Sequence, residues 1–124
     1  MGSGFKDLLV WHRAKALAVE IYKVSGSGLL ARDFGLCDQM RRAAVSIASN
    51  IAEGAERETD KESGRFLYIA EGSAGELQTQ LLIAVEIGYL PENVGGELCQ
   101  KCDAVSRMLA ALIKRRKAQE KVLS

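Results

Sequence analysis

The sequence predicts an all-α protein, an antiparallel up-down-up-down four-helix bundle, and three observations lead to this prediction. Apolar residues recur at helical spacing in four segments. The 124 residues include a single proline, so long stretches are free to remain helical. The links between the segments are short, as they are between antiparallel neighbours in a bundle. We expect the bundle at residues 5–113, a disordered segment or cloning remnant at 1–4, and a basic tail at 114–124.

The first helix is expected at about residues 5–24. Its apolar residues follow the 4-3-4-3 spacing of a helix that packs at a shallow angle on its neighbours. These residues are Val10, Ala14, Leu17, Ile21 and Val24. Residues 25–28 (Ser-Gly-Ser-Gly) should end the helix, because glycine adopts the left-handed closing conformation without a steric penalty.

The second and third helices are expected at about residues 36–56 and 60–87. Thr59, followed three residues later by Glu62, predicts a capping box at the start of the third helix. The predicted apolar stripe of the second helix is Leu36, Met40, Ala43, Ile47 and Ile51. The predicted buried side of the third helix is Phe66, Ala70, Ser73, Leu77, Leu81 and Ala84.

The fourth helix follows a turn at residues 88–91 (Gly-Tyr-Leu-Pro), and its charge differs from that of the rest of the chain. Its apolar positions are Leu98, Cys102, Val105, Leu109 and Leu112. Residues 101–124 contain seven basic and two acidic residues, a net charge of +5, whereas the first hundred contain ten basic and fourteen acidic residues, a net charge of −4. A basic end stabilises the helix dipole, and it would also attract an anionic partner. Both interpretations remain open.

The sequence contains no recognisable catalytic or metal-binding motif. His12 has no Ser or Cys partner placed by a motif, so we expect a surface or interface residue. Cys99 and Cys102 form a C-x-x-C, but a structural zinc needs four ligands and only Cys37 and His12 remain. We therefore expect buried thiols, no metal, no cofactor and no catalytic residue. The odd number of cysteines and the lack of a membrane-spanning apolar stretch indicate a cytoplasmic protein.

Polar residues line one side of both the second and the third expected helix. If these helices are antiparallel, residues whose numbers add up to 118 lie level with each other. The resulting pairs are Arg42 with Glu76, Ser46 with Gly72, Asn50 with Tyr68, and Glu53 with Arg65. Opposite charges meet at both ends of this ladder, which favours a polar seam that fixes helix register or a subunit interface. A ligand-binding surface is the alternative interpretation.

Several stretches of this sequence also match the signature of a protein family, and they occur in the family's order along the chain. They are residues 39–47 (Gln-Met-Arg-Arg-Ala-Ala-Val-Ser-Ile), 49–54 (Ser-Asn-Ile-Ala-Glu-Gly), 70–73 (Ala-Glu-Gly-Ser), 76–81 (Glu-Leu-Gln-Thr-Gln-Leu) and 88–90 (Gly-Tyr-Leu). From about residue 5 to residue 113, the chain resembles the bacterial four-helix-bundle proteins encoded in intervening sequences of 23S ribosomal RNA genes. The family often has a proline where this chain has Ala48, so we expect a straighter second helix here.

The resemblance implies a homopentameric ring of four-helix bundles without an established enzymatic activity. It also implies kinship with the accessory proteins of diversity-generating retroelements, similar bundles that bind nucleic acid and a reverse transcriptase. The signature polar positions of the family in this chain are Arg42, Ser46, Asn50, Glu53, Arg65, Ser73 and Glu76.

The leading hypothesis from the sequence is a non-enzymatic homo-oligomer that binds RNA or DNA. Phosphate contacts repeated around a ring would give affinity with little reading of base sequence. The candidate contacts are Arg41, Lys114, Arg115, Arg116 and Lys117. The alternative is a protein–protein interaction scaffold that holds another protein, such as a reverse transcriptase, and has no direct nucleic-acid role.

Overall fold

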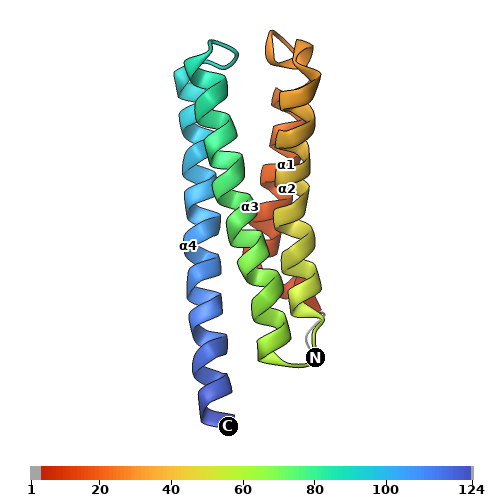
Figure 1. Ribbon diagram of the computed structural model, residues 1–124, viewed down its shortest axis with the longest axis vertical. Helices are drawn as coiled ribbons and strands as arrows, with labels where there is room; N and C mark the ends of the chain where they lie inside the picture. Colours follow the sequence, from red (N-terminus) through yellow and green to blue (C-terminus); the bar gives the residue numbers. More distant parts are fainter. Residues whose placement is uncertain (1–3, 124) are drawn as a thin grey trace.

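The computed structural model describes residues 4–123, with side chains for residues 4–118, and these residues form an all-α four-helix bundle (Figure 1). The α-helices are α1 (Leu9–Val24), α2 (Phe34–Ala55), α3 (Asp60–Glu86) and α4 (Glu92–Leu123). Two short 3-10 helices, η1 (Gly4–Asp7) and η2 (Leu30–Arg32), precede α1 and α2. The predicted fold class is confirmed. The expected N-terminal segment lies outside the described residues, apart from Gly4, which begins η1.

Local capping interactions set where the helices begin and end. The Thr59 side chain accepts a hydrogen bond from the Glu62 backbone N–H at 3.1 Å, as expected at the start of α3. Asp33, which the sequence analysis did not single out, caps α2 by accepting from the Leu36 N–H at 3.0 Å. Gly88 closes α3 with a φ of +82°, a conformation that glycine adopts without strain.

The core stripes of α1 and α4 agree with the predicted spacing. All five predicted apolar positions of α4 are buried, as are the first four of α1, and Val24 is half-buried. In α2, Cys37 is buried and Leu36 only partly, because the N-terminal turn faces the loop that precedes it. The remaining predicted positions of α2 are buried.

The buried side of α3 differs from the prediction at two positions. Phe66 and Ser73 are only half-buried, whereas Leu67 and Ala74 are fully buried. The reason is that α3 packs against both α2 and α4, so its buried side is broad and centred between the two neighbours. Helices α2 and α3 approach closely near their connection, where a Cβ on Gly54 would lie 3.1 Å from the carbonyl oxygen of Ser63.

Helix α4 is longer than the sequence pattern indicated. It continues without interruption to Leu123, so residues 114–117 lie on a helix rather than at the start of a separate tail. Figure 1 shows the last turns of α4 extending beyond the ends of the other helices. Helix α2 is likewise uninterrupted through Ala48. Among the described residues, no helix has the length and apolarity required to cross a membrane.

Candidate functional site

Three half-buried polar side chains lie at the centre of the predicted polar seam, and one hydrogen bond among them joins α2 to α3. The hydroxyl groups of Ser46 and Ser73 share a hydrogen bond of 2.8 Å. Asn50 donates from Nδ2 to the Ser46 hydroxyl at 3.0 Å and to its carbonyl oxygen at 2.8 Å. Because apolar residues surround this group on the buried side, a shift in register would leave these polar atoms without partners. This group therefore fixes how α2 and α3 align.

The prediction that charged residues of α2 and α3 pair with each other at the two ends of the seam is wrong. Arg42 pairs with Asp38 of the same helix at 3.0 Å, and Glu53 pairs with Arg57 of the same helix at 2.6 Å. Both are i,i+4 neighbours on an exposed helix surface, where such pairs form most easily. The Arg42 side chain is 80% exposed. The other two predicted partners, Arg65 and Glu76, are exposed and form no ion pair among the described side chains.

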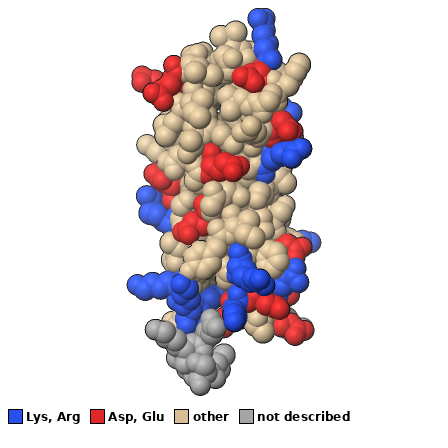
Figure 2. All heavy atoms as spheres, viewed as in Figure 1, with Lys and Arg blue, Asp and Glu red and all other residues tan. Residues whose placement is uncertain are grey.

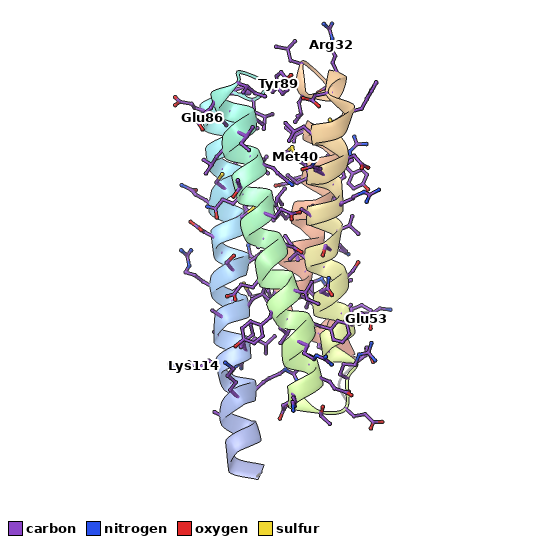
Figure 3. All side chains as sticks on the ribbon, in the orientation of Figure 1. Arg32, Met40, Glu53, Glu86, Tyr89 and Lys114 are labelled. Carbon is purple, nitrogen blue, oxygen red and sulfur yellow. The ribbon has the colours of Figure 1, made fainter. Side chains whose placement is uncertain are left out.

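Arg41 is separated from the other predicted nucleic-acid contacts. Its Nε donates to the Ser25 hydroxyl at 2.8 Å, and its guanidinium lies 4.7 Å from the centre of the Tyr22 ring. It thus holds the end of α1 against α2. Figure 3 labels its neighbour Met40 and the distant Lys114, which lie towards opposite ends of the bundle. The structure does not bring Arg41 together with residues 114–117.

Two of the four basic residues near the end of α4 bind to α3. Arg116 lies 3.4 Å from Asp60, and the two side chains are only 24% and 20% exposed. The Lys117 ammonium lies 5.1 Å from the centre of the Tyr68 ring. Lys114 and Arg115 are exposed and have no ion pair among the described side chains. Figure 2 shows Lys and Arg side chains gathered near this end of the molecule, with acidic residues beside them.

The three cysteines and the histidine do not form a cluster. Cys37, Cys99 and Cys102 are buried free thiols, and burial raises the pKa of Cys102 to about 12. Almost none of this thiol is therefore in the nucleophilic thiolate form at neutral pH. His12 donates from Nε2 to the carbonyl oxygen of Lys6 at 2.7 Å. Within the part of the chain that the structure describes, no three His, Cys, Asp or Glu side chains are grouped as metal ligands would be.

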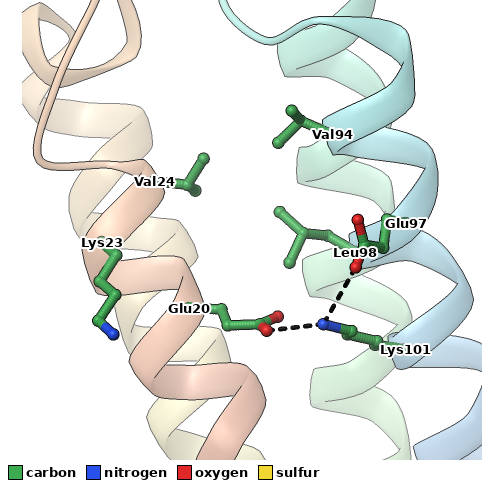
Figure 4. A pocket seen from close by; sticks show the side chains of 7 residues that line it. All are labelled: Glu20, Lys23, Val24, Val94, Glu97, Leu98 and Lys101. Carbon is green, nitrogen blue, oxygen red and sulfur yellow. Dashed lines mark hydrogen bonds and ion pairs between the residues drawn. The ribbon is translucent and has the colours of Figure 1, made fainter.

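The seam between α1 and α4 is hollowed along much of its length. The part nearest the interhelical loops is a groove of about 330 Å³, lined by Val24, Val94 and Leu98 and by charged residues below them (Figure 4). Lys101 spans this seam, with its Nζ 2.6 Å from a Glu20 oxygen and 3.5 Å from a Glu97 oxygen. The hydrogen bond to Glu20 is the main reason that the pKa of Lys101 is raised.

Two smaller cavities, of about 150 and 210 Å³, continue along the α1/α4 seam towards the C-terminal end of α4. Together we call them the lower groove. Alanines of both helices, Ala16, Ala104 and Ala111, form part of its wall. Arg13 and Arg115 line it and form no ion pair among the described side chains.

The outward side of α3 is apolar, which the sequence analysis missed. Its large apolar residues are between 44% and 52% exposed. We call this surface, with the exposed residues between them, the α3 face. It consists of Tyr68, Ile69, Gly72, Gly75, Glu76, Thr79, Leu82, Ile83, Glu86 and Ile87. The signal was present in the sequence, because isoleucines and leucines occur on both sides of this helix.

The fold and these surfaces define a helical-bundle protein with an exposed apolar helix, a hollowed interhelical seam and a basic helix end. The sequence profile of the 23S rRNA-intervening sequence proteins matches residues 6–111, and the chain belongs to this family. No curated protein matches the sequence.

A similar solved structure is that of a protein with unknown function from the S23 ribosomal protein family of Bacteroides thetaiotaomicron. The two superpose with a TM-score of 0.79 and share 22% sequence identity, over 86% of this chain and 99% of the other. At this identity the likeness establishes the fold alone.

Proposed function

We propose that this protein is a non-enzymatic homo-oligomer, a pentameric ring of four-helix bundles, that binds RNA or DNA through the basic end of α4. The observation that carries the proposal is the pair Lys114 and Arg115, which are exposed and have no ion pair among the described side chains. Cations without a carboxylate partner can contact phosphates without first breaking an ion pair.

The position of these residues supports the same proposal. Both are exposed, and Lys114 lies towards the end of the bundle past which the last turns of α4 extend (Figure 3). Arg116 and Lys117 contact α3 and hold this part of α4 in place. We therefore revise the set of candidate phosphate contacts from five residues to Lys114 and Arg115, with Arg116 as a positioning residue.

Fluorescence anisotropy of labelled structured RNA and duplex DNA, measured across a salt series, tests this proposal. The test variant carries Lys114→Ala and Arg115→Ala. The matched control carries Lys23→Ala and Arg32→Ala, which remove the same charge from exposed residues towards the opposite end of the bundle. For duplex DNA, each lost phosphate contact lowers the slope of log K against log salt by about 0.9.

For the test variant, we expect the magnitude of the slope of log K against log salt to fall by at least about 1.8, because two phosphate contacts are lost in one subunit. It should lose proportionately more if several subunits touch the same nucleic acid. The control should bind as the wild type does. Equal weakening in both variants would mean that net charge, not this surface, determines binding. Absence of binding by the wild type at low salt would end the nucleic-acid proposal.

The second candidate is a protein-interaction scaffold without a direct nucleic-acid role. The exposed apolar residues of α3 favour it, since contiguous apolar surface on a folded protein commonly marks a protein contact. Association through such a surface should persist at high salt. Association that persists at high salt, together with no measurable nucleic-acid binding, would favour this candidate.

A further inference from the structure

One exposed aromatic ring, that of Tyr68, lies in the basic half of the bundle. The structure describes all seven aromatic residues of the chain, and three of them are exposed: Tyr22, Phe34 and Tyr68. Tyr22 and Phe34 lie towards the end of the bundle at which Figure 3 labels Arg32, whereas Tyr68 lies in the half that carries Lys114. Proteins that bind single-stranded nucleic acid combine exposed aromatic rings with a positively charged surface.

The Tyr68 ring is held in place and is still open to a ligand. The ammonium of Lys117 lies 5.1 Å from the centre of the ring, close enough for a cation to be attracted to the ring face. Tyr68 nevertheless remains 47% exposed, so a base can reach the ring. Because the side chain is already ordered by this contact, a ligand loses less free energy in ordering it.

The cations of α4 lie level with this ring. Gln78 donates from Nε2 to Asp103 at 3.2 Å, and α3 and α4 are antiparallel (Figure 1), so residues whose numbers add up to 181 lie level with each other. Lys114 is therefore level with residue 67, next to Tyr68. It also lies one helical turn from Lys117 on the same side of α4. The exposed Lys114 is thus beside the ring and has no ion pair among the described side chains.

The charge around the ring is positive when both helices are counted. Within seven residues of Tyr68, α3 carries two cations and two carboxylates, which cancel. The Arg116–Asp60 pair also neutralises itself. The exposed basic residues of α4 then leave an excess of three positive charges. The α3 charges are Lys61, Glu62, Arg65 and Glu71, and the α4 cations are Lys114, Arg115 and Lys117.

Cations lie on two sides of the ring. Arg65 precedes Tyr68 by three residues, so the two lie on the same side of α3. Arg65 is exposed and has no ion pair among the described side chains. With Arg65 on one helix and Lys114 on the other, phosphates on both sides of a stacked base would each have a cation to contact.

We propose that this protein binds unpaired nucleotides of a single strand, with a base stacked on Tyr68 and the flanking phosphates on Arg65 and Lys114. A base inside a duplex is covered by its neighbours, so the ring selects unpaired bases. Stacking does not distinguish the bases, since each has a π-face. The inference rests on the nucleic-acid binding proposed above and names the class of nucleic acid that the basic end takes.

Two labelled oligonucleotides of equal length test the stacking by fluorescence anisotropy across a salt series. One is a single strand of mixed sequence, and the other is an abasic strand, which has the same phosphates and no bases. Tyr68→Ala removes the ring, and Tyr68→Phe keeps it. The matched control is Tyr22→Ala, because Tyr22 is also 47% exposed and has the Arg41 guanidinium 4.7 Å from its ring centre.

We expect the wild type, Tyr68→Phe and Tyr22→Ala to bind the strand with bases at least about 5-fold more tightly than the abasic strand, the effect of one stacked base. In Tyr68→Ala this preference should fall by at least about 5-fold. The salt slope of Tyr68→Ala should equal that of the wild type, because the phosphate contacts remain.

The results separate this inference from the proposed function. If the wild type binds neither strand at low salt, both are overturned. If it binds both strands equally, stacking is refuted and phosphate binding by the basic end remains. A preference for bases that persists in Tyr68→Ala, or that is lost equally in Tyr68→Phe or Tyr22→Ala, would also refute the role of this ring.

Discussion

Replacement of Gly95 with alanine should show how closely α4 packs against α3 near their connection. Gly95 is buried in the first turns of α4, and a Cβ at this position would overlap Cγ2 of Val85. A valine side chain is stiff about χ1, because both methyl groups branch from Cβ. It therefore cannot swing aside without leaving its preferred rotamer.

The expected magnitudes follow from two opposing effects. Alanine is favoured over glycine in a helix by about 1 kcal/mol, whereas a forced overlap in a packed interior costs about 1–3 kcal/mol. Gly95→Ala should therefore destabilise the protein by about 1 kcal/mol. In a Val85→Ala background the overlapping methyl is gone, so Gly95→Ala should stabilise by up to about 1 kcal/mol. The coupling between the two positions is then about 2 kcal/mol.

Urea denaturation followed by circular dichroism, at one fixed chain concentration, measures this double-mutant cycle. Gly96→Ala is the matched control, because Gly96 is exposed and its added Cβ would have no atom within 4 Å. The control should be stabilising in both backgrounds. If Gly95→Ala had the same effect with Val85 as without it, overlap with this side chain would not explain the buried glycine.

Three further predictions concern thiol titration, the basic helix end and the polar seam. The folded-state pKa of Cys102 is raised above its ordinary value of 9.0 to about 12, so this thiol's contribution to stability is fully present below pH 9 and is lost as the pH rises towards 12. Denaturation at pH 8–11 should show a steeper loss for the wild type than for Cys102→Ala. Arg116→Ala breaks the pair with Asp60 and should lower the free energy of unfolding by about 1 kcal/mol. Lys114→Ala should change it by less than about 0.5 kcal/mol. Equal effects of the two substitutions would contradict the structural role of Arg116. Ser73→Ala removes the hydroxyl that contacts Ser46 and should lower the free energy of unfolding by about 1 kcal/mol in the same assay. An unchanged denaturation midpoint would show that the Ser46–Ser73 pair does not fix the α2–α3 register.

The helical spacing of apolar residues was enough to predict the fold class and most of the core. It worked best for α1 and α4, where nearly all of the predicted apolar positions are buried. It was less accurate for α3, where Phe66 and Ser73 were placed in the core instead of Leu67 and Ala74. With apolar residues on both sides of a helix, periodicity alone does not identify the side that packs inward.

The candidate site was harder to predict, because charge type is visible in a sequence and side-chain partners are not. Arg41 contacts Ser25, 16 residues away, and Arg116 contacts Asp60, 56 residues away. Neither contact follows from local spacing. The course of α4 past Ile113 was also missed, since the apolar pattern fades there while Lys, Arg and Ala continue to favour helix.

The hollowed α1/α4 seam also has a consequence for local unfolding. Helix α1 meets α4 along a boundary with cavities on most of its length, and the Glu20–Lys101 pair is the ion pair that crosses it among the described side chains. Segments with less buried contact open at lower free energy than the core. Backbone amides of α1 should therefore exchange their hydrogens with solvent sooner than those of α2 and α3.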